Sequence, residues 1–289
     1  MATAEPLDLR DFDVPGRGRG ILDVIQHRYL LRLLVRKGTA TRYRNSVLGW
    51  TWSYVKPGAQ FLIYYFVMGI ILGIHRDVQN FAVYLFAGVV IVNLFNEAFG
   101  NATNAIVDNG SLVKKIYLPR ELFPVAAIIV ASVHFLPQIV ILLAVCILLG
   151  WLPTLTAVGA FLLGTVLVLL FSLGLGLFFS GLNVRFRDAQ NFVELIRMFS
   201  TWTSPVLYTW SLVANELPAW AFHVYMSNPL TVSVELFHLA FWEPTTTANP
   251  GLPPHFGIYL GSAVIVTVLF LIIGQLNFRR FERTFAQDL

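Results

Sequence analysis

The sequence predicts an all-α integral membrane protein, and three observations lead to that prediction. Of its 289 residues, 56% are hydrophobic and only 12% are charged, and the mean hydropathy is +0.68, which is too apolar for an ordinary soluble domain. The apolar residues gather into runs close to the length of a bilayer-spanning helix. The Lys and Arg residues fall between these runs, so the net charge of +4 indicates membrane orientation and not a nucleic-acid partner.

The amino-terminal part predicts two segments before the membrane domain. Residues 1–20 are polar and lack an apolar run, so we expect a flexible tail and no cleaved signal peptide. In residues 21–45, Arg28, Arg32 and Arg36 recur every four residues with leucines opposite. This spacing favours an amphipathic helix in the membrane interface, followed by a linker; a simple basic flank is the alternative.

Residues 46–278 are predicted to form a domain of six membrane-spanning helices. Trp50, Trp52 and Tyr54 form an aromatic belt at its entrance. Each apolar run can cross a hydrocarbon core about 30 Å thick. The expected spans are residues 56–74, 81–106, 124–150, 155–180, 191–212 and 257–278.

The distribution of basic residues predicts the orientation. With six spans, only Arg76 of the 20 Lys and Arg residues falls on the side opposite the termini. The positive-inside rule therefore places both termini in the cytoplasm, including the basic tail at 279–289. The protein is expected in a cytoplasmic membrane, surrounded by its lipids.

The long outer loop is predicted to contain two short helices. Asn228-Pro229 has the form of an N-cap followed by proline at the first helical position, and residues 230–242 are apolar. Residues 217–226 form a second short apolar segment. Because neither segment is long enough to span the membrane, the pair is expected to form a re-entrant or interfacial hairpin.

Small residues four apart predict close helix packing and, with the small number of spans, a dimer. These residues are Gly69 and Gly73, then Ser172, Gly176 and Ser180, and Gly257 and Gly261. A bundle of six helices leaves little room for a wide pore. A large solute would therefore need a passage between two copies, so we expect a homodimer.

The loop between the second and third expected spans is suited to binding a soluble partner. Residues 108–124 combine a turn, a short amphipathic segment and a Pro-Arg-Glu break. Leu112, Val113, Ile116, Tyr117 and Leu118 would fill a groove in that partner, with Lys114, Lys115 and Arg120 at the rim. A basic loop held by lipid headgroups remains the alternative.

One polar face and one aromatic face are candidates for lining a passage. Asn93, Asn96, Glu97 and Asn104, with Gly100 and Asn101, fall on one arc of the second span and must face protein or water. They either join helices or line a hydrated path. In the fifth span, Phe199, Trp202 and Tyr208, with Trp210, offer flat faces on which sugar rings can slide; ordinary packing and an aromatic belt are the alternative.

The motifs of nucleotide, metal and hydrolase sites do not occur in this sequence. There is no GxxxxGK[ST] loop, so ATP is not bound by that route, and neither HExxH nor GxSxG is found. The six histidines are scattered, and His134 is interpreted as a satisfied interior histidine. We therefore expect no metal, no cofactor and no catalytic residue in this chain.

Four stretches together resemble the membrane subunits of ABC-2 type polysaccharide exporters. They are KKIYLPRELFP at 114–124, GLNVRFRDAQNFVEL at 181–195, SPVLY at 204–208 and SNPLTV at 227–232. The resemblance covers nearly the whole chain. It extends to Wzm-type O-antigen permeases and their teichoic acid and capsule relatives, and is greatest to permeases that export lipid-linked galactan for the mycobacterial cell wall.

This resemblance implies an exporter of two permeases and two separate Wzt-type ATPases, which bind the ATP and Mg²⁺. The cargo would be a polymer linked to undecaprenyl diphosphate. Residues 111–121, including Pro119 and Glu121, would form the coupling helix, and residues 217–242 would form gate helices that include Trp220, Asn228 and Pro229. Arg185, Arg187 and Asp188 match a cytoplasmic loop where the lipid diphosphate would enter. A direct contact is our inference from the bidentate geometry of Arg, and pairing within the loop or with the ATPase is the alternative.

Two other functions remain open at this point. An ABC-2 permease for drugs or lipids would share the fold and export small amphiphiles. A multi-pass glycosyl- or acyltransferase would need acceptor-facing acids, but the outer loop has only Glu216, Glu235 and Glu243, without a paired-carboxylate pattern.

Overall fold

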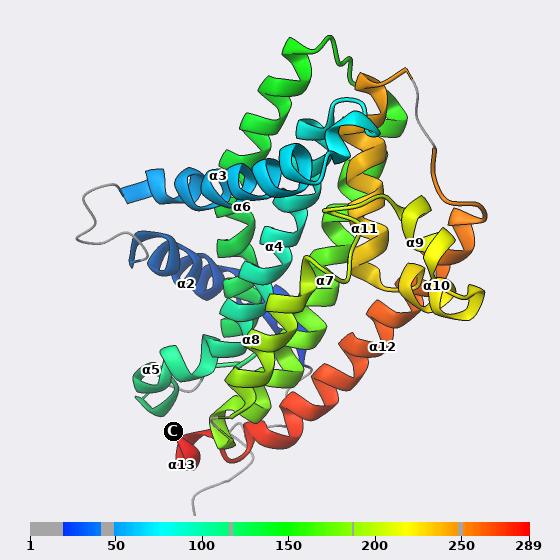
Figure 1. Ribbon diagram of the computed structural model, residues 1–289. Coiled ribbons are helices and arrows are strands. Elements are labelled where there is room, and N and C mark those ends of the chain that lie inside the picture. Colours follow the sequence, from blue (N-terminus) through cyan, green and yellow to red (C-terminus); the bar gives the residue numbers. More distant parts are fainter. Residues whose placement is uncertain (1–19, 42–48, 116–117, 187, 248–250) are drawn as a thin grey trace, which may run out of the picture.

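A computed structural model of the protein describes residues 20–41, 49–115, 118–186, 188–247 and 251–289, and the described residues contain helices and no β-strand (Figure 1). Most of the predicted 1–20 tail therefore lies outside the described residues. Four helices are long and apolar enough to cross a membrane. They are α4 (Phe81–Asp108), α6 (Leu122–Leu148), α7 (Leu155–Arg185) and α12 (Phe256–Glu282). Each matches an expected span, and the all-helical prediction is confirmed.

Helix α4 forms the centre of the bundle. It packs against α6 and α7, and it is the most buried of the four long helices. Phe95, Phe99 and Ile106 of α4 are almost fully buried. Because α4 is apolar on most sides, its few polar residues must find partners within the bundle.

The amino-terminal helices lie across α6 (Figure 1). A short α1 (Ile21–Gln26) leads into α2 (Arg28–Thr41), which packs on α6. Arg28, Arg32 and Arg36 are exposed along α2, while Leu34 is half-buried, which confirms the predicted amphipathic pattern.

The first expected span begins earlier than predicted and changes helix type within it. Helix α3 (Trp52–Tyr64) continues directly into the π-helix η3 (Tyr65–Ile71), and Gly73 ends the run with a positive φ of 77°. The continuous helical run over 52–71 is about 30 Å long at 1.5 Å per residue. It lies across α4 and α6, and it contacts both (Figure 1).

The expected fifth span is shorter than predicted. Instead of a helix over 191–212, α8 (Ala189–Ser200) is followed by irregular turns and then by α9 (Trp210–Glu216). Pro205 explains the break, because proline lacks a backbone N–H and disfavours helical geometry in the residue before it. Hydropathy over this stretch did not distinguish a broken segment from a continuous helix.

The predicted pair of short helices in the long loop is present. They are α10 (Ala219–Met226) and α11 (Pro229–Phe237), and the π-helix η5 (His238–Trp242) extends α11. Asn228 caps α11, since its side-chain Oδ1 accepts a hydrogen bond from Leu230 N at 3.0 Å. All nine residues of α11 are buried, so this helix is inserted into the bundle between α4, α7 and α12.

The closest helix contact in the described residues joins α7 to α12. A Cβ on Gly174 would lie 2.8 Å from the backbone of Phe270 and Leu271, and one on Gly274 would overlap the Gly174 carbonyl group. Only glycine allows backbones to approach this closely. The predicted ridge at Gly176 packs against Ala102, whereas Gly261 meets no other helix within the protomer.

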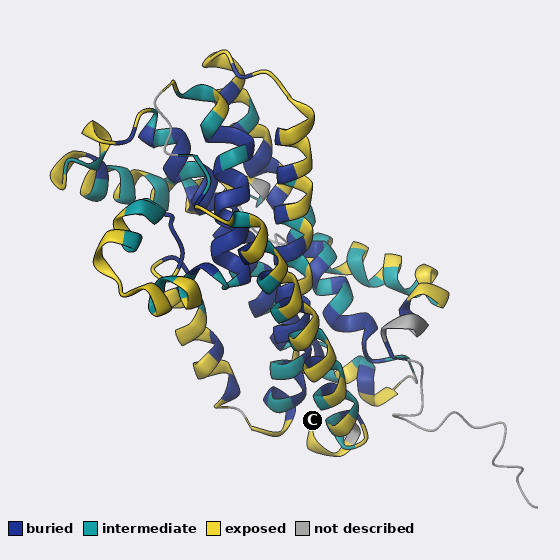
Figure 2. Ribbon diagram, turned by 90° about the vertical axis from the view of Figure 1, so that its right-hand side faces the viewer, coloured by how far each residue is buried: buried dark blue, intermediate teal, exposed yellow. Residues whose placement is uncertain are grey.

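Exposed residues run along the outer sides of the helices (Figure 2), and many of them are large and apolar. On α12, Ile258, Ile265 and Leu276 are each more than 60% exposed. Soluble proteins rarely expose apolar residues so densely, and the pattern fits contact with lipid or a second chain.

Five short elements complete the described fold. They are the 3₁₀ turns η2 (Gly49–Thr51), η4 (Ile74–Arg76) and η6 (Glu243–Thr245), with α5 (Gly110–Lys115) and α13 (Phe285–Asp288).

Candidate functional site

A polar cavity lies between α3, α4, α6 and α8, and its volume is about 280 Å³. It contains Asn93, Asn96 and Glu97, three of the residues predicted to line a passage. The remaining lining residues are Trp52, Ser53, Lys56, Pro57, Gln60, Asn101, His134, Gln138 and Arg197. The otherwise apolar set of helices therefore holds a space that water can enter, and amide, carboxylate and cationic groups line it.

Glu97 and His134 form a pair at the wall of this polar cavity. Glu97 Oε1 lies 2.9 Å from His134 Nδ1, and the His134 side chain is 1% exposed. A neutral imidazole with its proton on Nδ1 donates a hydrogen bond to the carboxylate, and so does an imidazolium. His134 is an interior histidine, as predicted, and its Nδ1 is paired with Glu97.

Arg197 reaches the polar cavity from α8 by crossing α4 at Gly100. A Cβ on Gly100 would lie 2.8 Å from Arg197 Nη1, so the missing side chain provides the room. In the sequence, Arg197 counted only toward the orientation of the protein. Its place inside the apolar run 191–212 was the signal for a different role, because charges at membrane depth face protein or water.

The polar face of α4 is divided between two uses. Asn104 Oδ1 accepts a hydrogen bond from Asn183 Nδ2 of α7 at 3.0 Å, and Asn96 Oδ1 accepts one from Ser200 Oγ of α8 at 3.0 Å. These bonds join helices. Asn104 is not among the residues that line the polar cavity, whereas Asn93 and Glu97 are.

The aromatic residues of the fifth segment lie on the surface or in the irregular turns. The Phe199 and Trp202 side chains are more than 50% exposed and do not line the polar cavity. Tyr208 is half-buried, and its hydroxyl donates to the Trp202 carbonyl group. A passage along Phe199 and Trp202 would therefore have to lie outside the single protomer.

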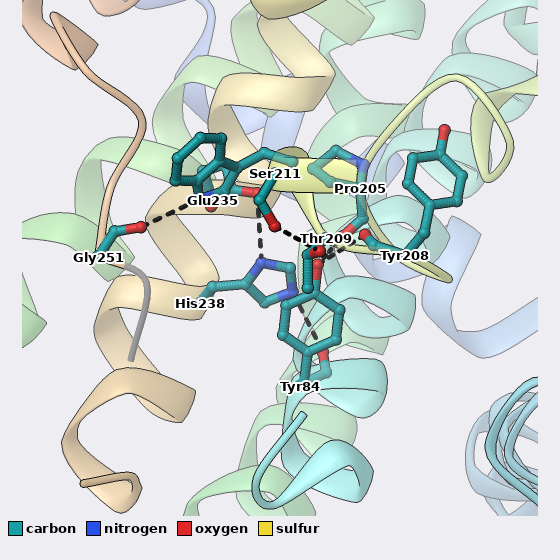
Figure 3. Close-up of polar contacts among 9 residues, drawn as sticks. Tyr84, Pro205, Tyr208, Thr209, Ser211, Glu235, His238 and Gly251 are labelled. Atoms are coloured by element: carbon teal, nitrogen blue, oxygen red, sulfur yellow. Dashed lines mark hydrogen bonds and ion pairs between the residues drawn. The ribbon is translucent and has the colours of Figure 1, made fainter. Parts of the chain in front are cut away.

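Tyr84 of α4 holds the irregular turns in place (Figure 3). Its hydroxyl lies 2.8 Å from both the Pro205 and the Tyr208 carbonyl oxygens. The Tyr84 ring stacks on His238 with centroids 3.8 Å apart. Since the break at Pro205 leaves carbonyl groups without helical partners, Tyr84 supplies the donor that they would otherwise lack.

Glu235 of α11 and His238 of η5 lie close to these turns. His238 Nδ1 is 3.7 Å from Glu235 Oε1, and both side chains are at most 5% exposed. This pairing was not predicted. Because the pair is sealed from solvent in the protomer, it does not provide the accessible acid and base that a transferase would need.

The predicted gate residues separate into two groups. Asn228 and Pro229 start α11 and join Phe171 and Phe270 around a cavity of about 470 Å³. Trp220 of α10 is instead 72% exposed, away from these residues.

The predicted coupling segment lies at the end of the bundle that holds the C-terminus (Figure 1). Helix α5 covers Leu112, Val113, Lys114 and Lys115 and packs against α13. Leu118 and Pro119 follow it, and Ile116 and Tyr117 lie outside the described residues.

Arg120 and Glu121 point into the bundle. Arg120 is 7% exposed, donates to the Glu282 carbonyl group and lies over the Phe285 ring at 5.6 Å. Glu121 Oε1 accepts a hydrogen bond from Gln275 Nε2 at 2.9 Å. The prediction of Arg120 at an exposed rim is therefore wrong in the protomer, because α12 and α13 cover it.

The predicted diphosphate-entry residues lie at the turn between α7 and α8. Arg185 and Asp188 are both exposed, and Arg187 lies outside the described residues. The Arg185 guanidinium lies 5.5 Å from the centroid of the Phe186 ring.

A family model described as ABC-2 type transporter matches residues 29–242, from α2 through the end of η5. The chain belongs to this ABC-2 type transporter family. Family membership and the four apolar helices make it a multi-pass protein of the inner membrane, and permeases of this family work with an ATPase partner.

Relatives of this ABC-2 chain include polysaccharide permeases, which confirms the resemblance seen in the sequence. An O-antigen export system permease protein RfbA of Klebsiella pneumoniae is 26% identical over 260 residues, covering 90% of this chain and 95% of that protein. RfbA of Myxococcus xanthus is 27% identical over 271 residues, covering 94% and 99%. The capsule polysaccharide export inner-membrane protein BexB of Haemophilus influenzae is 23% identical over 269 residues, covering 90% and 93%.

Proposed function

We propose that this ABC-2 permease exports a lipid-linked polysaccharide, carried on undecaprenyl diphosphate, across the cytoplasmic membrane. The polymer would be a cell-wall galactan or an O-antigen. The observation that carries the proposal is the end-to-end likeness to permeases named for O-antigen export, which covers at least 90% of this chain. The chain would hydrolyse nothing itself, and two Wzt-type ATPase subunits would bind ATP and Mg²⁺.

The proposed topology has six spans and cytoplasmic termini. The four long helices supply four spans, the run α3–η3 supplies another, and α8 with the turns after it supplies the last. The basic residues support the orientation, since Arg76 alone lies opposite the termini in this arrangement. Cytoplasmic termini place α5 and α13 where an ATPase would bind.

The proposed passage lies between two copies of the chain. The exposed apolar residues of α8 and of the turns after it, among them Phe199 and Trp202, would face the partner. Aromatic faces in such an interface offer sugar rings apolar contact without holding them by directional bonds. A passage formed by two protomers accommodates a polymer that one compact bundle cannot.

The coupling proposal assigns α5 and the residues after it to a cleft in the ATPase. Lys114 and Lys115 are exposed at its end, next to α13. Motion of α5 would reach the bundle directly, because Arg120 ties the segment after it to the last turn of α12.

The test is ATP hydrolysis by the permease and its ATPase, purified together and reconstituted in liposomes. The permease alone should show no hydrolysis, and added lipid-linked glycan should stimulate hydrolysis by the complex. A matched lipid diphosphate without glycan is the control. Lack of stimulation by any lipid-linked glycan would contradict the proposal. Stimulation by small amphiphiles alone would favour a drug or lipid exporter, and glycosyl or acyl transfer by the permease alone would favour a transferase.

A further inference from the structure

An apolar pocket adjoins the polar cavity along α3. Its volume is about 200 Å³. The two spaces share Pro57 and Gln138 in their walls, so they lie side by side between α3, α4 and α6, and together they are called the hollow. The walls of the apolar pocket come mainly from Phe61, Val83, Phe86, Ile141, Leu142 and Val145.

The polar half of this hollow contains two cationic side chains, Lys56 and Arg197, and one carboxylate, Glu97. Lys56 and Arg197 form no salt bridge with a carboxylate in the part of the chain that the structure describes, and Glu97 is engaged with His134. The Nε atom of Arg197 is buried and has no hydrogen-bond partner among the described residues. A buried donor of this kind is destabilising unless an acceptor is supplied, and an anion would supply it.

The hollow is also open to the surface from which a lipid would enter. Trp52 and Tyr54 are both 39% exposed and flank Lys56 on α3. Trp and Tyr side chains favour the level of the lipid headgroups, and a lysine beside them favours the same level.

We propose that this hollow binds one anionic phospholipid of the surrounding bilayer. Its phosphate would lie against Lys56 and Arg197, whose planar guanidinium can donate two parallel hydrogen bonds to phosphate oxygens. One acyl chain would enter the apolar pocket beside Phe61 and Phe86. The other would lie on the exposed apolar side of the run α3–η3, where Leu62 and Phe66 are 64% and 56% exposed.

The charge and the shape together select this occupant. A sugar would leave the apolar pocket empty. A free phosphate would also leave the apolar pocket empty, because it has no apolar part. A phospholipid satisfies both halves, and the bilayer around the protein supplies it at high concentration. The site does not depend on what the permease exports.

The structure provides a substitution for each half of the site. Lys56→Gln combined with Arg197→Gln removes the charges. Gly58→Leu fills the apolar pocket, because Gly58 lines it and a Cβ there would have nothing within 4 Å. Gly159→Leu on α7 is the matched control, since Gly159 also faces open space and does not line either half of the site.

The experiment is photo-crosslinking of full-length permease in nanodiscs with a photoreactive phosphatidylglycerol that carries its reactive group on one acyl chain. Wild type should be labelled on α3 and α6 near Phe61 and Ile141. The charge variant should lower this labelling at least about tenfold, because loss of even one charge-assisted contact costs about that much. Gly58→Leu should lower it as well, because its side chain would occupy the space of the acyl chain. Gly159→Leu should keep it. The paired conservative variant Lys56→Arg with Arg197→Lys should restore most of it, which separates charge from folding.

Three results would overturn the proposal. Equal labelling of wild type and both variants would show that the hollow does not hold the lipid. Labelling spread evenly over α12 would indicate an ordinary lipid annulus. Displacement of the probe by a polyprenyl phosphate, but not by unlabelled phosphatidylglycerol, would assign the site to an isoprenoid carrier instead.

Discussion

Replacement of Gly274 by alanine tests the backbone contact between α7 and α12. The new methyl group would overlap the carbonyl group of Gly174, and a peptide backbone cannot rotate away as a side chain can. Overpacking of this kind destabilises by about 1–3 kcal/mol, and the upper value applies where nothing flexible can yield. Alanine recovers about 1 kcal/mol of helix propensity over glycine. The net loss is therefore about 2 kcal/mol.

The assay is thermal unfolding of purified protein in detergent, at one fixed scan rate because membrane proteins often unfold irreversibly. A loss of about 2 kcal/mol lowers the midpoint by about 4–8 °C for a chain of this size. Gly261→Ala is the matched control on the same helix, because a Cβ there meets nothing within 4 Å. It should melt at or slightly above the wild-type temperature. Equal midpoints for the two variants would refute the close contact.

Three further substitutions test other parts of the structure. Tyr84→Phe removes the donor to the Pro205 and Tyr208 carbonyl groups and should lower the free energy of unfolding by about 1–3 kcal/mol. Proteolysis at the turns should become faster, and an unchanged rate of proteolysis would contradict the role of Tyr84. Asn228→Ala removes the α11 cap and should lower the unfolding free energy by about 1 kcal/mol, whereas Asn228→Ser should not; equal losses would exclude a capping role. Leu118→Asp, or Tyr117→Asp, should abolish co-purification of the ATPase while membrane insertion persists; normal co-purification would remove this segment from the interface.

Sequence patterns with a local physical cause were predicted well. The Asn228-Pro229 cap depends on two adjacent residues, and α11 begins where they place it. The long apolar runs became α4, α6, α7 and α12, because span length depends on bilayer thickness and not on packing partners.

Features that depend on tertiary packing were not predicted. Spacing alone suggested Gly257 and Gly261 as packing ridges, yet the close contact uses Gly174 and Gly274, since only the assembled bundle decides which face meets another helix. The fifth segment was expected to be one helix because residues 191–212 form an apolar run. Pro205 lies within that run, and hydropathy does not report the break that it causes.

The candidate site was predicted in part. Asn93 and Glu97 were identified from the polar arc of α4, and both line the polar cavity. Lys56 and Arg197 were not predicted as site residues, because the positive-inside rule counts a charge without locating its side chain. The apolar pocket beside them arises from three helices far apart in the sequence, so no local pattern could have revealed it.

The most direct test of the proposed export measures movement of the polymer itself. Inverted membrane vesicles that contain the permease and its ATPase would be supplied with lipid-linked glycan and ATP, and glycan in the lumen would be scored as resistant to added glycosidase. Export predicts protection that requires ATP, this chain and the ATPase together. Hydrolysis of ATP by the complex without any protected glycan would contradict the account.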